Sequence, residues 1–286
     1  MTLLAEAVII GGAMMAASDK TQILLTNDDG IRSPGLWAAA EVLCELGYVT
    51  VAAPREQCSG AGRSMPNTSD GKLREEEVEV GGESWKVYAV GGTPAQAVQH
   101  GALELMPRPP DLVVAGINYG ENLGLGVTVS GTVGAALEAG ALGYPSLAVS
   151  LEMPESYFFS YSEEIDFSAA AHFTQHFGRL LLERRMPEDV HVLKIDVPSD
   201  ATTETPWKMT RLSRHKYYTP VPPPRERLED SQRMGFEVKL DEVLLEQDSD
   251  VYVVRLERHV AVTPLSLDMT SRVDLEELER LLREAG

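Results

Sequence analysis

Residues 23–35 read ILLTNDDGIRSPG, an apolar strand pattern that stops abruptly at two adjacent carboxylates, Asp28 and Asp29. The residues from Ser33 to Gly47 predict a helix, with Ser at its N-cap, Pro in its first turn and Gly as its stop. Two neighbouring carboxylates repel each other and do not help a strand to pack. We therefore expect a positive charge to lie where this strand leaves the core.

Strand and helix patterns alternate from this point to about residue 199. Apolar strands that alternate with helices predict the α/β class, with a mostly parallel sheet covered by helices on both faces. A hairpin is expected within this part of the chain, at residues 77–90. Strands are expected at residues 22–26, 48–53, 111–116, 145–151 and 190–198, and helices at 33–47, 94–106, 131–143 and 166–185.

The pattern changes after about residue 199. Residues 200–250 are polar and rich in Pro, residues 250–265 suggest two strands, and residues 273–285 suggest a terminal amphipathic helix. We therefore divide the chain into an N-terminal extension (1–20), a core (21–199) and a C-terminal extension (200–286). The first of these is apolar and ends in small residues, but it lacks the basic start of a secretory signal and is too short to span a membrane.

Composition narrows the classes of function. The 286 residues include 25 Lys and Arg against 44 Asp and Glu, a formal net charge of −19, which argues against binding of nucleic acid polymers. Two cysteines form no disulfide framework, and no Cys and His spacing suggests zinc. We expect a cytoplasmic protein that neither binds nucleic acid polymers nor enters a membrane.

Oxygen-bearing side chains follow three of the expected strands. Asp28 and Asp29 follow the first, Ser59 lies in the glycine-rich turn after the second, and Asn118 and Asn122 follow the strand at 111–116. Ligands of an open parallel sheet gather beyond the carboxyl ends of its strands. Carboxylate, hydroxyl and amide oxygens suit hard ions such as Mg²⁺ or Mn²⁺. The adjacent acids are therefore expected to hold a divalent cation.

Ser130, Gly131 and Thr132 directly precede a helix of small residues, and a helix N-terminus is a ready anion site. A cation site beside an anion site implies a metal-bound phosphate. Taken singly, each motif also fits a turn or a helix cap, and it is their joint placement that favours a site. Positive charge to offset the acids is expected from three arginines of the same loops: Arg32, Arg55 and Arg63.

These residues resemble the SurE survival-protein family of metal-dependent 5′/3′-nucleotidases. The resemblance runs from about residue 23 to residue 270 and rests on TNDDGI, APREQCSGAGRS, GGTPAQAV, PDLVVAGINYGENLG, SGTVGAALEAGALGYPSLAVSL and VAVTPLSLDMT, in that order. It implies a Rossmann-like three-layer sandwich whose C-terminal part, with a hairpin and a helix, helps to form homodimers or homotetramers. It also implies hydrolysis of nucleoside monophosphates to nucleoside and phosphate, with 3′-nucleotides as further candidates.

The resemblance also implies roles for single residues. One divalent cation per subunit, Mg²⁺ or Mn²⁺, is expected on Asp28, Asp29, Ser59 and Asn118. The phosphate is expected to contact Asn122, Ser130, Gly131 and Thr132. Four residues depart from the family pattern, and we expect them at the rim of the substrate site: Lys194 and Asp196, where asparagines are usual, and Tyr119 and Val129.

The expected mechanism is hydrolysis of a phosphomonoester, in which the cation polarises the phosphoryl group and Asp28 or Asp29 accepts a proton from water. A signalling receiver domain also places an acidic pair after its first strand. That alternative needs a phospho-accepting Asp at the end of a later strand, whereas Asp70 lies in a polar loop. A non-catalytic module that binds metal and nucleotide remains a further alternative.

Overall fold

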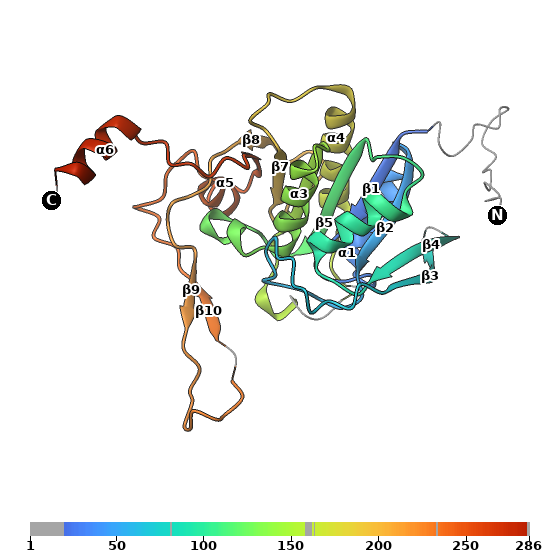
Figure 1. The fold of residues 1–286 in the computed structure, drawn as a ribbon, viewed down its shortest axis with the longest axis horizontal. Helices are drawn as coiled ribbons and strands as arrows, with labels where there is room; N and C mark the ends of the chain where they lie inside the picture. The colour runs from blue at the N-terminus through green and yellow to red at the C-terminus, as the bar shows by residue number, and fades with distance from the viewer. Residues whose placement is uncertain (1–19, 81, 158–161, 163, 233, 285–286) are drawn as a thin grey trace.

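A mostly parallel sheet forms the centre of the computed structural model (Figure 1), which describes residues 20–80, 82–157, 162, 164–232 and 234–284. Within these residues the strand order is β3-β4-β2-β1-β5-β6-β7-β11-β8. The strands are β1 (Gln22–Thr26), β2 (Tyr48–Pro54), β3 (Leu73–Val80), β4 (Glu83–Val90), β5 (Leu112–Tyr119), β6 (Ser146–Leu151), β7 (Val192–Val197), β8 (Trp207–Met209) and β11 (Val260–Leu265).

The pairing of the strands confirms the predicted sheet. Strands β2, β1, β5, β6 and β7 run parallel to one another, and β4 also pairs parallel with β2. The expected hairpin is also present, because β3 pairs antiparallel with β4 over its whole length. Strand β11 runs antiparallel to β7. The carboxyl ends of the central strands therefore meet along one edge of the sheet.

Helices cover both faces of this sheet. Helices α1 (Pro34–Leu43) and α4 (Ser168–Glu183) pack on the face that carries Ile23 and Leu25. Helices α2 (Pro94–His100) and α3 (Gly131–Ala141) pack on the opposite face, which carries Leu24. Successive side chains of a strand point to opposite faces, so β1 is buried on both sides. This three-layer arrangement confirms the predicted fold class.

Local signals explain where the helices begin. Ser33 is the N-cap of α1 and Pro34 its first residue, as the sequence predicts. Thr93 and Gln96 form a reciprocal capping box at the start of α2. Helix α2 is shorter than expected, because the turn at Gly101–Leu105 is wound as a π-helix before the chain leaves at Met106.

The C-terminal part contributes to the sheet and also leaves it. Strands β8 and β11 extend the main sheet beyond β7. Strands β9 (Tyr218–Val221) and β10 (Gly235–Val238) form a separate antiparallel hairpin that projects from the body, and α6 (Leu275–Arg283) lies beyond the body at the C-terminus (Figure 1). Helix α6 confirms the predicted terminal helix.

The prediction of two strands over residues 250–265 is half wrong. Of the two segments, β11 is a strand, whereas α5 (Asp250–Arg255) is a short helix capped by the Ser249 hydroxyl, which accepts from the Tyr252 N–H. The valines of α5 are buried against Leu123 and Tyr217. Tertiary packing here overrides the strand preference of the β-branched valines.

Two further expectations concern the N-terminal extension and membrane-spanning helices. The predicted N-terminal extension (1–20) lies outside the described residues except for Lys20. In the described part of the chain, the structure contains no helix that is both long and apolar enough to span a membrane.

Candidate functional site

The predicted acids lie at the carboxyl edge of the sheet, just beyond β1. Asp28 and Asp29 are 3% and 1% exposed, so both carboxylates are buried. Asn118 lies beside them on β5, whose last residues pair with β6 after an irregularity between Ala115 and Asn118. The strand is thus longer than predicted, and Asn118 is part of it rather than of the loop that follows.

One hydroxyl brings three of the predicted residues together. Thr132, in the first turn of α3, donates from Oγ1 to Asp28 Oδ1, and the same oxygen lies 3.1 Å from Asn118 Oδ1. Gly131 lets the helix approach this closely, because a Cβ at its position would lie 2.6 Å from Asp28 Cβ and 2.7 Å from Asp28 Oδ2. The N-terminus of α3 is therefore packed directly against the Asp28 carboxylate.

Ser130 acts as the N-cap of α3. Its Oγ accepts from the Val133 N–H at 3.1 Å, which is the structural role that the sequence left open for this residue. Because a hydroxyl both accepts and donates, the Ser130 O–H can still donate toward a ligand while it caps the helix.

The loop after β2 closes over the acids. The Cys58 N–H donates to the Asp28 carbonyl oxygen at 2.7 Å, and Gln57 Nε2 donates to Asp29 Oδ1 at 3.1 Å. Asp29 Oδ2 accepts in addition from the Tyr119 N–H at 3.0 Å. Ser59 follows Cys58 in this loop and is exposed. Gln57 lies within the APREQCSGAGRS motif, but the motif did not predict its contact with Asp29, because this contact depends on how the loop folds back.

The two carboxylates are held in an unfavourable electrostatic setting. Burial raises the pKa of Asp28 to about 6, against hydrogen bonds from Thr132 and from backbone N–H groups that include those of Gly131 and Thr132. Burial first, and the Asp28 charge second, raise the pKa of Asp29 well above its usual value. A divalent cation at this place would favour both charged forms and reverse these shifts.

The donor set fits a hard cation. Over the described residues, no group of three or more His, Cys, Asp or Glu side chains is arranged to hold a metal. The oxygens gathered here are instead the two carboxylates, the Asn118 amide and the Thr132 hydroxyl. Oxygen-only sites with few carboxylates suit Mg²⁺ or Mn²⁺, which keep part of their water shell, rather than zinc.

The three arginines do not offset these acids in the way the sequence suggested. Arg55 pairs with Asp70 at 2.9 Å, and Arg63 Nε lies 2.7 Å from Glu138 Oε2. Arg32 is largely exposed and lies 3.8 Å from the Glu76 carboxylate. Each guanidinium is therefore paired with an acid other than Asp28 and Asp29.

Asn122 lies in the loop after β5 and is tied to the core. Its backbone N–H donates to Asp196 Oδ1 at 2.8 Å, and its Nδ2 donates to Ser150 Oγ at 2.8 Å. The prediction that Lys194 and Asp196 lie at the rim of the substrate site is wrong, because both are fully buried in β7. Ser150 lies within the SGTVGAALEAGALGYPSLAVSL motif, but its contact with Asn122 was not predicted, because the motif does not show which residue Ser150 meets.

The other two departures from the family pattern differ in exposure. Tyr119 is buried at the end of β5, where its ring contacts Phe167 edge-on with centroids 5.2 Å apart. Val129 is 60% exposed, one residue before the Ser130 cap. Of these two, only Val129 presents its side chain to solvent beside the predicted phosphate site.

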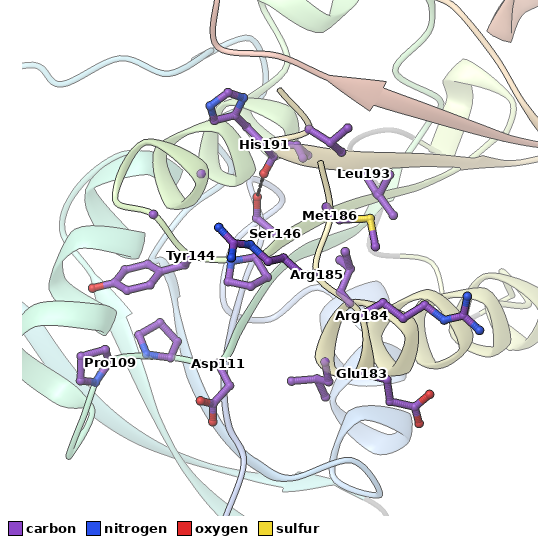
Figure 2. A pocket seen from close by; sticks show the side chains of 18 of the residues that line it. Pro109, Asp111, Tyr144, Ser146, Glu183, Arg184, Arg185, Met186, His191 and Leu193 are labelled. Carbon is purple, nitrogen blue, oxygen red and sulfur yellow. Dashed lines mark hydrogen bonds between the residues drawn. The ribbon is translucent and has the colours of Figure 1, made fainter. Parts of the chain in front are cut away.

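A separate groove in the described residues lies elsewhere. It has a volume of about 1190 Å³ and is lined by residues at the amino ends of β6 and β7, among them Ser146 and Val192. Figure 2 shows Tyr144, Arg185 and Met186 around it. This groove lies at the opposite ends of the strands from Asp28 and Asp29, so it is separate from the predicted site.

Comparison with known proteins agrees with the motifs. The family model described as Survival protein SurE matches residues 23–219. The chain belongs to the SurE family. A relative from Thermococcus gammatolerans, named 5′-nucleotidase SurE, is 43% identical over 262 residues, which are 91% of this chain and 96% of the relative. One of the same name from Thermococcus kodakarensis is 41% identical over 264 residues, 91% of this chain and 98% of the relative.

A solved structure shares the fold. The crystal structure of a SurE protein from Aquifex aeolicus superposes with a TM-score of 0.71 at 31% identity, and the match covers 91% of this chain and 99% of that one. The SurE resemblance and the fold class predicted from the sequence are therefore both confirmed.

Proposed function

We propose that this chain is a metal-dependent 5′-nucleotidase, a hydrolase that converts nucleoside monophosphates to nucleoside and phosphate. Membership of the SurE family, whose relatives carry that name, supports the reaction. The observation that carries the proposal is the meeting of Asp28, Asn118 and Thr132 at the N-terminus of α3. It joins buried oxygen ligands for a cation to a helix end that favours a phosphate.

The residues proposed to hold one Mg²⁺ or Mn²⁺ per subunit are Asp28, Asp29, Ser59 and Asn118. When bound, the cation supplies polarisation of the phosphoryl group and a lowered pKa for an attacking water. Asp29 is oriented by the Tyr119 N–H and by Gln57. Either Asp28 or Asp29 accepts the proton of that water.

The phosphate is proposed to bind between Asn122 and the start of α3. Asn122 supplies one side-chain N–H, and Ser130 supplies a hydroxyl whose oxygen is held by the capping bond from the Val133 N–H. Gly131 and Thr132 supply the positive end of the helix dipole. These groups stabilise charge on the equatorial oxygens as the ester bond breaks.

The C-terminal extension (200–286) is proposed to contact a second copy in a homodimer or homotetramer. Every side chain of α6 is exposed, and four of these residues are leucines: Leu275, Leu278, Leu281 and Leu282. An exposed apolar row on a helix marks a contact surface. The two free thiols, Cys44 and Cys58, fit a reducing cytoplasm, which is the proposed location.

The function is tested by phosphate release from 5′- and 3′-nucleoside monophosphates with Mg²⁺, with Mn²⁺ and after treatment with EDTA. We expect release that depends on metal, stops with EDTA and returns when Mn²⁺ is added again. Absence of release with either metal would overturn the enzymatic assignment, and nucleotide binding without turnover would favour the non-catalytic module.

A further inference from the structure

Asn122 is held by two buried side chains from neighbouring strands. Asp196 on β7 accepts from its backbone N–H, and Ser150 on β6 accepts from its side-chain Nδ2, each at 2.8 Å. Ser150 and Asp196 are direct partners in the parallel pair of β6 and β7, and both are fully buried. Backbone and side chain of Asn122 are thus fixed from the same place in the sheet.

The Asp196 carboxylate belongs to a buried group of three charges. Lys194, two residues earlier on β7, donates from Nζ to Asp196 Oδ2 and, at 3.0 Å, to Asp250 Oδ2. All three side chains are fully buried. Asp250 in turn accepts from the Gly124 N–H at 2.9 Å. One ammonium therefore joins two carboxylates, and each of them holds a backbone N–H of the loop that carries Asn122.

This arrangement fixes where the Asn122 amide can point. A side-chain amide has two N–H hydrogens, and Ser150 Oγ takes one of them. The second N–H of Nδ2 remains to donate to a ligand oxygen. Loops that bind substrate are usually mobile, and a loop anchored to core strands keeps its donors in place before substrate arrives.

We propose that Asp196 and Ser150 are positioning residues for hydrolysis, which hold the Asn122 amide in line with the phosphate, while the Lys194 ammonium, itself held by Asp250, favours the charged form of the Asp196 carboxylate and keeps it in place. The proposal rests on the proposed nucleotidase function and on Asn122 as its phosphate contact. Asp196 and Ser150 are fully buried and do not contact the substrate themselves. Both act through Asn122, so their loss should lower kcat rather than weaken substrate binding.

The chain offers a matched pair of variants. K194N/D196N replaces an ion pair by two amides and leaves the net charge of the buried group unchanged. The amide oxygen that this variant carries at position 196 can still accept from the Asn122 N–H. K194N/D196A has the same charge but no acceptor at position 196. The two variants differ only at position 196, where Asn carries an amide oxygen that can accept and Ala has no polar side-chain atom.

A third variant tests the side-chain anchor. Ser150→Ala removes the oxygen that receives Asn122 Nδ2 and replaces it by hydrogen, so it adds no bulk to the buried strand. Steady-state kinetics are measured for all variants and the wild type with Mn²⁺ and the nucleoside monophosphate that the wild type hydrolyses fastest. Thermal unfolding of each protein reports whether the fold is intact.

We expect K194N/D196A and S150A to lose about 10- to 100-fold in kcat with KM changed by less than about threefold. K194N/D196N should keep kcat within about threefold of the wild type, because an acceptor is restored. Equal loss in both double variants, or wild-type kcat in K194N/D196A or in S150A, would overturn the proposal. If K194N/D196A does not fold, the kcat values of S150A and K194N/D196N test the proposal: wild-type kcat in S150A would still overturn it, and so would a loss in K194N/D196N as large as that in S150A. A wild type that hydrolyses no nucleotide would instead refute the proposed function.

Discussion

Gly131 offers a direct test of the close packing between α3 and Asp28. In Gly131→Ala the new Cβ would lie 2.6 Å from Asp28 Cβ, where ordinary contact begins near 3.4 Å. The carboxylate or the helix must therefore yield by about 0.8 Å, and a misplacement of about 1 Å at a reacting centre can lower a rate by about 100-fold. We expect kcat/KM to fall by about 10- to 100-fold.

The change should spare the fold. Overpacking of a buried site typically costs about 1–3 kcal/mol, which a protein of this size tolerates. Gly178→Ala is the matched control, because Gly178 lies inside α4 and its new Cβ would meet Leu112, Leu46 and Leu43 at 3.4–3.6 Å, an ordinary distance. That variant should gain about 0.5–1 kcal/mol of stability and keep wild-type activity.

The assay is phosphate release from a nucleoside monophosphate at several Mn²⁺ concentrations, with denaturant unfolding of the same samples. Gly131→Ala should need more Mn²⁺ for half-maximal rate, because the Asp28 carboxylate is displaced. Wild-type kcat/KM and wild-type Mn²⁺ dependence in a folded Gly131→Ala protein would refute the role given to this contact.

Buried and exposed groups elsewhere in the chain lead to three other predictions. Lys194→Met leaves two buried carboxylates without their cation and should lower the free energy of unfolding, measured with denaturant, by about 3–5 kcal/mol. A decrease below about 1 kcal/mol would contradict this prediction. Burial raises the pKa of Glu121, so this carboxyl group stays protonated to a higher pH in the native state than in the unfolded chain. The stability that the protonated carboxyl contributes is therefore lost as the pH rises from the unfolded pKa through the native pKa. Glu121→Gln should therefore gain stability relative to the wild type as pH rises above 4.5, the ordinary glutamate value, whereas a difference that stays constant with pH would speak against this. Leu281→Lys on α6 should shift the molar mass in light scattering toward a smaller assembly, and an unchanged mass would exclude α6 from the subunit contact.

The sequence was sufficient for elements whose signals are local. The strand that ends at Thr26 and the Ser33 and Pro34 start of α1 are present as predicted. The same is true of the hairpin of β3 and β4 and of α6. In each case the hydrophobic period, the cap or the turn residues lie within the element itself, so no distant contact is needed to interpret them.

Features that depend on distant contacts were missed. Helix α5 is valine-rich and its sequence favours a strand, but Asp250 at its start is buried and accepts from the Gly124 N–H, 126 residues away in sequence. Lys194 and Asp196 were expected at the rim of the substrate site, yet both side chains are fully buried in β7, which lies within the strand predicted at residues 190–198. Only the fold reveals that their charges compensate one another.

In the candidate site, too, residues in sequence motifs were predicted, whereas contacts between distant residues were missed. Motifs located Asp28, Asn118 and Thr132, and the structure brings these three together. Their roles toward metal and phosphate stay predictions. The supporting contacts of Gln57 and Ser150 had no sequence signal, because a polar side chain reveals its partner only after folding.

The central claim is that Asp28 holds the cation that hydrolysis requires, and Asp28→Asn tests it most directly. The amide keeps the size of the carboxylate and can still accept from Thr132, and it removes a buried charge whose pKa is raised by desolvation. The metal-free variant should therefore unfold at the same temperature as the wild type or higher. Phosphate release and Mn²⁺ binding by calorimetry are then measured on the same protein. The account predicts a folded variant with weakened Mn²⁺ binding and no hydrolysis, and near-normal hydrolysis in that variant would contradict it.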